Sequence, residues 1–359
     1  MASLSQRLKD RAKELGLSPV GITTATPLYE ARRILEQAEA LPFTTGSVLQ
    51  RTDPKLVWPE AKSVMMVGLP YIVPAEGPQA GTLQGYFAAG SGGQDYHCVL
   101  KEKLAELAAF LQSEAPGALT VPFVDTGPLV ERALAYRAGL GVWGENNFVL
   151  RPQVGSAFFL GGLATNVDLI SDSSIAGTCL QCGQCRDACP TNALDTPYLL
   201  DYRRCLSYWT QAKEVMPPEL RPLLGNRLYG CDTCLRACPL IEKSPLDGVT
   251  VDLATFLAIG NREFKQRYAS SSFAWRGRTV LQRNAVLALG NSGREEAIPI
   301  LIPLLSDPRI SIRITAAWSL GQYGAFESRL ALAKCLQQEI EPSVQAEIKK
   351  ALNESPRKW

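Results

Sequence analysis

The most informative stretch of this 359-residue chain is Cys179-Leu-Gln-Cys182-Gly-Gln-Cys185-Arg-Asp-Ala-Cys189-Pro190. A shorter run of the same kind follows at Cys231-Asp-Thr-Cys234-Leu-Arg-Ala-Cys238-Pro239, and Cys205 lies between the two. Eight of the ten cysteines therefore fall within residues 179–238. Such crowding predicts a shared function for these thiols, either as metal ligands or as a disulfide framework.

The spacing C-x2-C-x2-C-x3-C-P is the one that bacterial ferredoxins use. In that pattern three thiolates bind one [4Fe–4S] cube and the fourth cysteine binds a second cube. The second run lacks its first cysteine, and Cys205 can supply the missing ligand. We therefore predict two clusters, the first held by Cys179, Cys182, Cys185 and Cys238, and the second held by Cys189, Cys205, Cys231 and Cys234.

Two other uses of these cysteines compete with iron–sulfur ligation. Disulfides suit secreted chains, and the N-terminus shows no charged-then-apolar secretory signal. Two four-cysteine zinc sites would also use eight thiols, but zinc ribbons rarely place a third cysteine two residues after a C-x2-C pair. The spacing favours iron–sulfur clusters. Cys98 and Cys335 lie outside the cysteine-rich segment and are expected to be small, buried apolar side chains.

Composition narrows the class of protein further. The chain is 46% hydrophobic and 20% charged, with a net charge of +2 and a single histidine. These values exclude a disordered chain and a coiled coil, and one histidine excludes sites built on several. No apolar run reaches the ~18 residues that a membrane helix needs, so we expect a cytoplasmic protein without membrane contact. The near-zero net charge offers no argument for a nucleic-acid partner.

The segment before the cysteines alternates between helical and strand-like patterns. Apolar residues with helical spacing predict a helix over residues 4–17 that stops at Gly16. Further helices are predicted over 101–113 and 128–138. Strands are predicted at 20–24, 64–69, 120–124, 148–150 and 157–160. This alternation favours an α/β domain over residues 1–170.

Three further segments complete the predicted organisation. The ferredoxin-like segment covers residues 171–245, and a helical connector covers 246–275. Residues 276–359 contain an internal repeat, because Leu281–Gly290 aligns with Ile312–Gly321, 31 residues later. Paired helices at this period predict a short HEAT-like solenoid, which usually offers a binding surface. A purely structural cap is the alternative. The predicted fold class is a multidomain chain of α+β and α/β type.

The sequence shows no nucleotide-binding site. Gly139-Leu-Gly-Val-Trp-Gly144 matches G-x-G-x-x-G but follows a helical stretch, whereas the dinucleotide motif follows a strand. Gly139 is better explained as the end of that helix. No G-x4-G-K-[ST] phosphate-binding loop occurs in the chain. We therefore expect the electrons to come from a separate donor protein.

Candidate catalytic groups lie in the α/β segment. Asp125 follows a predicted strand, and a carboxylate at the C-terminal end of such a strand can face a ligand crevice. The alternative for Asp125 is an N-cap of the following helix. Glu131 and Arg132 can equally form a solvated ion pair, and His97 can equally be a packed core histidine.

Five stretches, together with the cysteines, carry a resemblance to a known family. They are Asp95-Tyr-His97, Asp125-Thr-Gly-Pro-Leu-Val-Glu-Arg132, Ala138-Gly-Leu-Gly-Val-Trp-Gly144, Gly155-Ser-Ala-Phe-Phe-Leu-Gly161 and Arg204-Cys-Leu-Ser-Tyr-Trp-Thr210. With them the chain resembles the epoxyqueuosine reductases over nearly its whole length. The resemblance implies a cobalamin cofactor beside the two [4Fe–4S] clusters, in a fold related to the reductive dehalogenases. It also implies that no histidine binds the lower face of the cobalamin, in line with the missing D-x-H-x-x-G signature.

The resemblance also implies roles for individual residues. Asp125 resembles the family's proton donor, and His97 and Arg132 are expected to line the substrate pocket beside it. Gln211 and Lys213 are expected to contact the cofactor or tRNA, and the HEAT-like repeats to form a tRNA-binding surface. The expected cobalamin contacts are Arg51, Asp125, Val149, Leu160 and Ser207.

The activity implied by the resemblance is the last step of queuosine synthesis. The epoxide of epoxyqueuosine, at the wobble position of a tRNA with a GUN anticodon, is reduced to an alkene by two electrons and two protons, and water is released. The implied partners are this tRNA and an external electron donor such as flavodoxin or ferredoxin, and the chain is expected to be a monomer.

Three other functions compete with this one. A reductive dehalogenase usually carries an export signal, which residues 1–20 lack. A plain ferredoxin-like carrier leaves the residues upstream of the cysteines without a role. A HEAT-based scaffold leaves the clusters without an electron acceptor.

Overall fold

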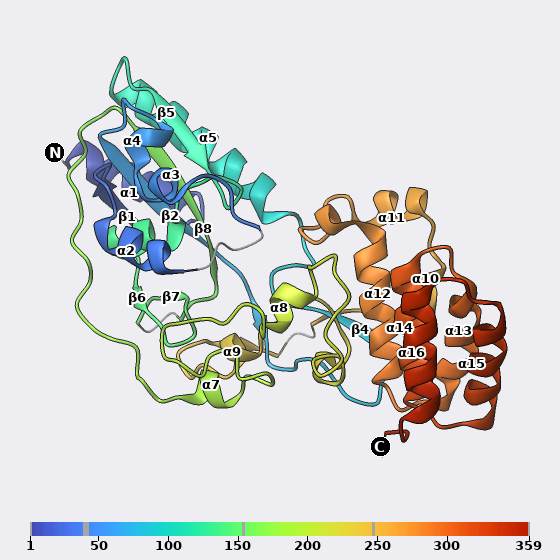
Figure 1. Ribbon diagram of the computed structural model, residues 1–359. Coiled ribbons are helices and arrows are strands. Elements are labelled where there is room, and N and C mark those ends of the chain that lie inside the picture. The colour runs from blue at the N-terminus through green and yellow to red at the C-terminus, as the bar shows by residue number, and fades with distance from the viewer. Residues whose placement is uncertain (1, 39–42, 153–154, 246–247, 358–359) are drawn as a thin grey trace.

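The computed structural model describes residues 2–38, 43–152, 155–245 and 248–357. Its elements form three regions (Figure 1). A four-stranded sheet with its helices lies at one end, a row of helices lies at the other end, and the cysteine-rich segment lies between them. This arrangement confirms the multidomain fold that the sequence predicts.

The sheet contains the strands β1 (Val20–Thr24), β2 (Ser63–Pro70), β8 (Phe158–Thr165) and β5 (Thr120–Phe123), in that order. All three neighbouring pairs are antiparallel. Four of the five predicted strands are therefore present in the sheet, although the last one extends to Thr165. The fifth, β7 (Val149–Leu150), pairs instead with β6 (Val142–Trp143) in a short hairpin.

The antiparallel pairing changes the explanation of Asp125. A carboxylate at the C-terminal end of a strand faces the ligand crevice in open α/β sheets. Because β5 runs antiparallel to β8, that rule does not apply here. The alternative of a helix N-cap is also wrong, since the N-cap of the following helix α6 (Glu131–Arg137) is Val130. Other contacts position Asp125.

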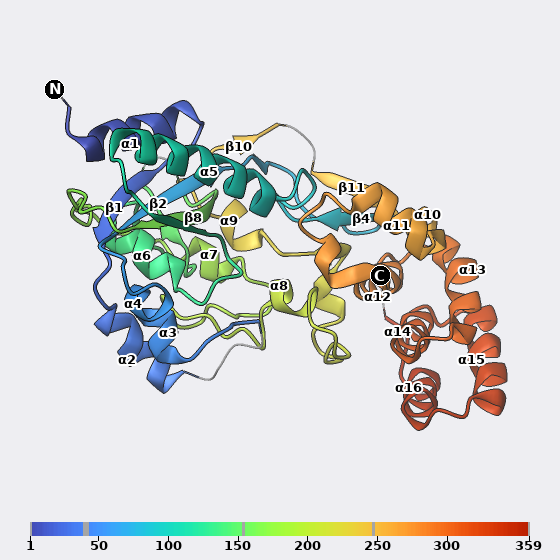
Figure 2. The same ribbon diagram turned by 90° about the horizontal axis from the view of Figure 1, so that it is seen from above.

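Helices cover both faces of the sheet (Figure 2). On one face, α1 (Leu4–Glu14) and α5 (Tyr96–Glu114) pack over strand residues such as Met65. On the other face, α6 packs against Met66, because successive side chains of a strand point to opposite faces. The helices α2 (Tyr29–Gln37), α3 (Val48–Thr52) and α4 (Pro54–Val57) lie beside α6.

The ends of two helices place residues of the candidate site. Helix α5 begins at Tyr96, earlier than predicted, because the Asp95 side chain accepts a hydrogen bond from the backbone N–H of His97. Helix α6 ends before Gly139, whose φ of +73° and N–H bond to Tyr136 belong to a left-handed helix terminus. The prediction that Gly139 terminates a helix is therefore confirmed.

The cysteine-rich segment has little regular structure. Its helices α7 (Gln184–Asp187), α8 (Leu206–Trp209) and α9 (Thr233–Arg236) are single turns. Strands from the N-terminal part pair with it or with the connector. Thus β3 (Val73–Pro74) pairs with β10 (Lys243–Ser244), and β4 (Gln84–Phe87) lies between β11 (Val249–Asp252) and β9 (Arg227–Tyr229). The regions interleave, and the domain boundaries given above stay predictions.

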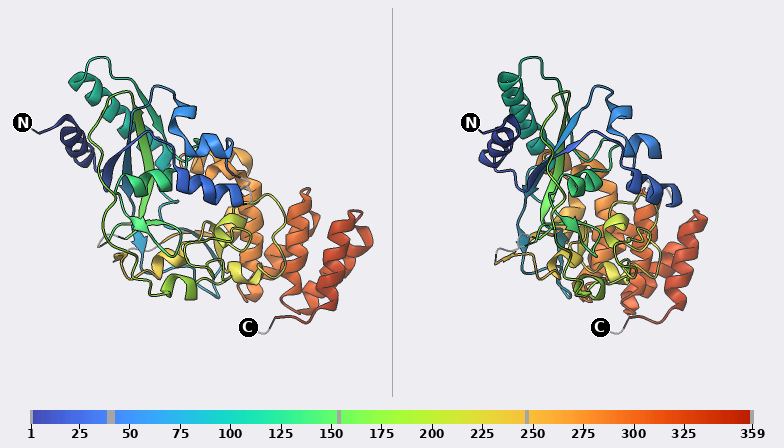
Figure 3. Two further views of the ribbon diagram at one scale, coloured as in Figure 1. Left: turned by 60° about the vertical axis from the view of Figure 1, so that its left-hand side comes forward. Right: turned by 90° about the vertical axis from the view of Figure 1, so that its left-hand side faces the viewer.

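The C-terminal helices stack in a row (Figure 3). The two aligned sequence blocks lie in α12 (Gly277–Gly290) and α14 (Ile310–Gly321), which confirms the repeat. A Cβ atom on Gly290 would lie 2.5 Å from Ser319 Oγ, so the glycine lets these two helices approach closely. The other helices are α10 (Leu253–Ala258), α11 (Asn261–Tyr268), α13 (Ile298–Leu301), α15 (Phe326–Gln338) and α16 (Pro342–Asn353). None of the helices in the described parts of the chain is long and apolar enough to cross a bilayer.

Two buried side chains of helix α12 form hydrogen bonds with the cysteine-rich segment. The guanidinium of Arg283 donates to the carbonyl oxygens of Trp209 (2.8 Å) and Ala212 (2.7 Å). The amide of Asn284 donates to the carbonyl oxygens of Thr210 (2.8 Å) and Leu228 (2.7 Å). Because buried hydrogen-bonded groups are costly to separate, the helical row has a fixed orientation relative to the cluster region.

Candidate active site and cluster sites

The four cysteines predicted for the first cluster lie around one hollow. Cys179, Cys182, Cys185 and Cys238 all line it, together with Glu145 and Asn146 of the β6–β7 loop. Burial raises the pKa of Cys185 to about 11, and the negative charges of Glu145, Cys179 and Cys238 raise it further. These thiols are therefore mutual neighbours, as the ligands of one cluster must be.

The four cysteines predicted for the second cluster are neighbours in the same way. Burial raises the pKa of Cys205 to about 11, with further increases from Cys231 and Cys189. Burial also raises the pKa of Cys234 well above its usual value, and the charges of Cys231, Cys205 and Cys189 add to the effect. Cys205 thus lies where the ferredoxin pattern has its missing cysteine.

The two sets of cysteines are adjacent to each other, since Cys185 of the first set also raises the pKa of Cys234 in the second. No three Cys, His, Asp or Glu side chains in the described ranges surround a single ion position. A [4Fe–4S] cluster has a different requirement, because four thiolates surround a whole cube. Two sets of four thiols fit two such clusters.

The candidate catalytic group is a row of three side chains at the start of α5 and the end of β5. His97 Nδ1 lies 2.7 Å from Asp95 Oδ1, and His97 Nε2 lies 3.4 Å from Asp125 Oδ2. The second distance is long for a hydrogen bond, as is common for catalytic contacts before substrate closes the site. The structure therefore brings His97 and Asp125 together, and the role of His97 in the substrate pocket stays a prediction.

The contact between His97 and Asp125 shifts the pKa values of the two side chains in opposite directions. The hydrogen bond to Asp125 is the largest factor that raises the pKa of His97 above 6.5, and Asp95 raises it further. The same contact with His97 is the largest factor that lowers the pKa of Asp125. The opposite directions of the two pKa shifts favour His97 over Asp125 as the holder of a shared proton. The Asp125 side chain is 64% exposed and can reach a ligand.

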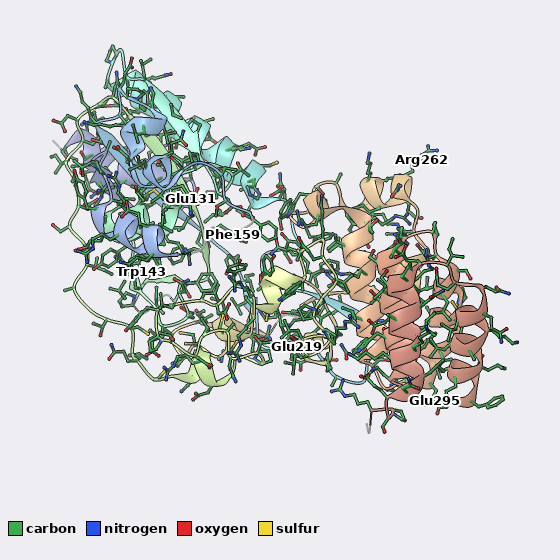
Figure 4. The ribbon with its side chains drawn as sticks, in the orientation of Figure 1. Glu131, Trp143, Phe159, Glu219, Arg262 and Glu295 are labelled. Atoms are coloured by element: carbon green, nitrogen blue, oxygen red, sulfur yellow. The ribbon has the colours of Figure 1, made fainter. Side chains whose placement is uncertain are left out.

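An aromatic stack fixes the orientation of the His97 ring. The Tyr96 ring stacks on His97 with centroids 4.0 Å apart, and on Phe159 of β8 with centroids 3.9 Å apart. Burial raises the pKa of Tyr96, and the negative charge of Asp125 raises it further. In Figure 4, Phe159 and Glu131 lie on the side of the sheet region that faces the cysteine-rich segment.

Arg132 connects the catalytic row to the first cluster site. Its guanidinium donates to the carbonyl oxygen of Asn147 at 2.5 Å. Asn147 lies in the β6–β7 loop whose neighbouring residues Glu145 and Asn146 line the hollow of the first cysteine set. Burial lowers the pKa of Arg132, and the positive charge of Arg51 lowers it further, so the two guanidinium groups are close to each other. The sequence gives no sign of this connecting loop.

The remaining predicted cobalamin contacts lie on several elements. Val149 is buried on β7, and Leu160 is half-buried on β8, and both belong to the apolar cluster around α6. Ser207 is half-buried in α8, where its carbonyl oxygen accepts a hydrogen bond from Thr210. Within the described residues no hydrogen bond joins these three side chains to Asp125, and their role stays a prediction.

The two residues predicted beyond the Cys205 motif differ in their surroundings. The amide of Gln211 donates to the carbonyl oxygen of Ser207 at 3.0 Å, so this side chain helps to close a turn. The Gln211 carbonyl oxygen also accepts from Arg276 Nε at 2.5 Å. Lys213 is exposed and can meet an anionic partner.

Sequence reasoning missed an exposed group of aromatic side chains beside Arg276. The guanidinium carbon of Arg276 lies 4.2 Å from the ring centre of Trp275 and 4.9 Å from that of Phe43. The Phe43 ring also contacts Tyr208, with centroids 5.3 Å apart. Trp275 donates its indole N–H to the Tyr229 hydroxyl, and the negative charges of Asp125 and Asp95 contribute to the raised pKa of Tyr229, which burial chiefly causes. This aromatic group, Phe43, Tyr208, Trp275 and Arg276, therefore lies near the catalytic row.

The two cysteines outside the clusters have different environments. Cys335 is half-buried, and its thiol contacts the carbonyl oxygen of Leu305 at 3.7 Å. Cys98 is exposed, so the prediction of a buried side chain is wrong for this residue. The buried stripe of α5 includes Leu100, and at 100° per residue Cys98 points well away from that stripe.

Family models match three parts of the chain. Residues 178–240 match the 4Fe-4S double cluster binding domain, and residues 277–353 match HEAT repeats. Residues 51–126 match the model described as epoxyqueuosine reductase QueG, DUF1730. The predictions of iron–sulfur clusters and of HEAT repeats are therefore confirmed, and the third match ends just after Asp125.

Whole-length comparisons agree with these matches. The epoxyqueuosine reductase of Bacillus subtilis is 38% identical, with 97% of this chain and 95% of the relative covered. That of Escherichia coli is 32% identical, with 89% of each covered. Among solved structures, epoxyqueuosine reductase with an epoxyqueuosine-modified tRNA-Tyr stem loop superposes with a TM-score of 0.90 at 38% identity, covering 97% of this chain and 98% of that one.

A further solved structure is similar over nearly the whole chain. It is an epoxyqueuosine reductase from Bacillus subtilis, 36% identical with a TM-score of 0.90, covering 97% of this chain and 98% of that one. Its catalytic loop, which contains an aspartate, is described as swung out of the active site. On identity, coverage and fold, the chain belongs to the epoxyqueuosine reductase family.

Proposed function

We propose that this protein is a tRNA epoxyqueuosine reductase, which converts the epoxide of epoxyqueuosine at the tRNA wobble position to the alkene of queuosine. The observation that carries the proposal is the Asp95–His97–Asp125 row, in a chain that also gathers two sets of four thiols. The reaction consumes two electrons and two protons and releases the epoxide oxygen as water. One chain thus combines a route for electrons with an exposed acid.

Cobalamin is the cofactor that this proposal requires. When bound, it would supply a cobalt centre that takes electrons from the clusters and delivers them to the epoxide. Both ring nitrogens of His97 face carboxylates, so this histidine is not available as a cobalt ligand. We assign the cobalamin contacts to Arg51, Asp125, Val149, Leu160 and Ser207.

The protons reach the departing oxygen through Asp125. Asp125 Oδ2 gives a proton to the oxygen and takes its replacement from His97 Nε2, while Asp95 holds the proton on His97 Nδ1. Arg132 holds the β6–β7 loop between this acid and the first cysteine set. We assign one cluster to Cys179, Cys182, Cys185 and Cys238 and the other to Cys189, Cys205, Cys231 and Cys234. The two sets are adjacent, so electrons can pass from one cluster to the other.

We assign the tRNA contact to the aromatic group as well as to Lys213 and the helical row. Proteins recognise unpaired RNA bases by stacking them on aromatic rings and on arginine. Trp275 is 56% exposed, and Phe43 is 43% exposed. An exposed tryptophan paired with a guanidinium, near the catalytic row, suits a base splayed out of an anticodon loop. The further proposals are a monomer, an external donor such as flavodoxin or ferredoxin, and a cytoplasmic location.

Replacing Trp275 by Ala is expected to weaken binding of an epoxyqueuosine-containing anticodon stem loop. Stacking of one base is worth ~1–3 kcal/mol, so Kd should rise by about 5–150-fold in a fluorescence anisotropy titration. The matched control is Tyr29→Ala, which removes another exposed ring that lies beside an arginine, Arg32. Equal Kd values for Trp275→Ala and the wild type would show that the aromatic group does not contribute to tRNA binding.

Replacing His97 by Asn is expected to change the pH dependence of kcat/KM. In the wild type the active proton is present below the raised pKa of His97 and is lost as the pH rises through that value. Without His97, Asp125 must hold the proton itself, at a pKa near the usual ~3.9. The variant should therefore gain about tenfold in rate for each pH unit between 7 and 5. A profile identical to that of the wild type contradicts the proton route.

The decisive test of the function is mass spectrometry of tRNA nucleosides after incubation with reconstituted protein and a chemical reductant. Epoxyqueuosine should disappear as queuosine forms, and a strain that lacks the gene should accumulate epoxyqueuosine. If reduced protein with both clusters and cobalamin leaves epoxyqueuosine unchanged, the proposed function is wrong, and a simple electron carrier becomes the better description.

A further inference from the structure

The loop that carries Asp125 has an unusual backbone conformation. The Thr126 N–H donates to the carbonyl oxygen of Val124 at 2.5 Å, which closes a three-residue turn around Asp125. Asp125 has a φ of +49°, in the left-handed region. A three-residue turn with positive φ at its centre is the rarer and more strained form. Such a conformation persists only where surrounding contacts hold it.

One such contact comes from Glu131. Its Oε1 accepts a hydrogen bond from the backbone N–H of Asp125 at 2.5 Å. Glu131 is the first residue of α6, and the next turn of this helix packs Leu134 and Ala135, both fully buried, into the protein core. The acceptor therefore stands on a rigid element, whereas the Asp125 side chain is exposed. No other role for Glu131 is used in the proton route above.

We propose that Glu131 is a positioning residue, whose side chain holds the backbone N–H of Asp125 and so keeps the Asp125 carboxyl group directed at His97 and the substrate. The inference rests on the proposed function, because it depends on Asp125 being the acid. It adds a residue that acts through Asp125 and does not itself meet the epoxide.

The charge state of Glu131 agrees with this role. Its pKa is raised to about 8, chiefly by burial and also by the negative charge of Asp125, whereas the hydrogen bond from the Asp125 backbone, His97 and Arg132 lower it. At neutral pH Glu131 is therefore mainly protonated, while Asp125 is ionised. A neutral carboxyl group still offers an oxygen acceptor, and it does so without placing a second negative charge beside Asp125.

The first test measures the hydrogen bond itself in the full-length protein. Hydrogen–deuterium exchange of peptides that cover residues 120–130 should be about tenfold faster in Glu131→Ala, the effect of losing one hydrogen bond. Glu131→Gln keeps an oxygen acceptor at the same place and should exchange at nearly the wild-type rate. Equal exchange in the wild type and Glu131→Ala would overturn the proposal, as would equally fast exchange in both variants.

The second test separates positioning from other roles. Glu131→Ala should lower kcat by about 100-fold, the effect of a misplacement of roughly 1 Å, without changing Kd for tRNA, and Glu131→Gln should recover most of the loss. In an Asp125→Asn background, Glu131→Ala should have little further effect, because the residue acts only through Asp125. A further 100-fold loss in that background would overturn the proposal.

Controls keep the outcomes distinguishable. Glu327 is an exposed glutamate in the first turn of α15, and Glu327→Ala should match the wild type in both tests. Unchanged iron–sulfur absorption and an unchanged melting temperature exclude misfolding. If the wild type reduces epoxyqueuosine and Glu131→Ala is equally fast, only the inference about Glu131 fails. If the wild type is inactive, the proposed function fails, and the exchange experiment still tests the hydrogen bond.

Discussion

Asp125→Asn is expected to lower kcat for epoxide reduction by roughly 10²–10⁴-fold, the usual contribution of a general acid. The amide has almost the same shape as the carboxyl group but cannot pass on a proton from His97 Nε2, which lies 3.4 Å from Asp125 Oδ2. The loop geometry should be kept, because the backbone N–H of residue 125 can still bind Glu131. The measurement is single-turnover conversion of epoxyqueuosine in tRNA, followed by mass spectrometry.

Two controls define this result. Kd for the tRNA stem loop and the absorption spectra of the clusters should not change, since Asp125 touches neither set of cysteines in the described structure. Lowering the pH should not rescue the variant, because an amide does not titrate in this range. Near-wild-type turnover by Asp125→Asn would show that another group protonates the oxygen. The proposed roles of His97 and Glu131 would then also be wrong, because both depend on Asp125 being the acid.

Cys205→Ala is expected to abolish turnover and to remove one cluster. Iron should fall from about eight to about four atoms per chain, because each cube holds four irons. The physical reason is that Cys205 is a buried neighbour of Cys189 and Cys231, so its loss leaves three thiolates for four irons. Iron analysis and electron paramagnetic resonance of the reduced protein measure the loss.

Cys238→Ala provides the complementary experiment. It should remove the other cluster, because Cys238 lines the hollow shared with Cys179, Cys182 and Cys185. The two variants should then show different resonance spectra whose sum approximates that of the wild type. Cys335→Ala is the matched control and should retain about eight irons, since this thiol lies in the helical row. Identical spectra from the two cluster variants would contradict the division of the ligands.

The local spacing of cysteines was sufficient to predict the cluster ligands. The four thiols that bind one cube must lie close together in space. The spacing C-x2-C-x2-C already brings three of them together, whatever the rest of the fold is. The more distant cysteines, Cys205 and Cys238, could be assigned because two clusters need eight thiols and the segment contains eight. Their burial and mutual electrostatic effects agree with that assignment.

Strand position was also largely predictable, whereas strand direction was not. The apolar runs around Val20, Val64 and Thr120 became strands, because β-branched and apolar side chains suit a half-buried pleated surface. Pairing partners are distant in sequence, and their order depends on which faces the helices cover. The alternation of helices and strands therefore suggested the parallel geometry of α/β sheets, and the protein instead has an antiparallel sheet.

The catalytic row was predictable only as separate residues. The motifs named His97, Asp125 and Arg132, but residues 28 positions apart give no indication that their side chains meet at 3.4 Å. The Glu131 contact was hidden for another reason, because it involves the backbone N–H of Asp125, which carries no sequence signal. Phe43 and Trp275 were missed because they lie more than 200 residues apart in the chain.

The sequence by itself determined the groups that the protein can bring to its chemistry: eight closely spaced cysteines, a single histidine and a repeat that forms paired helices. These features are local, since a few neighbouring residues are enough to define a ligand spacing or a helical face. Only the tertiary structure decided which of these side chains lie close to one another. It placed Asp125 3.4 Å from His97, joined Arg132 to the loop beside the first cysteine set, and set the aromatic group near them, because long-range contacts arise from packing of the whole chain rather than from spacing along it.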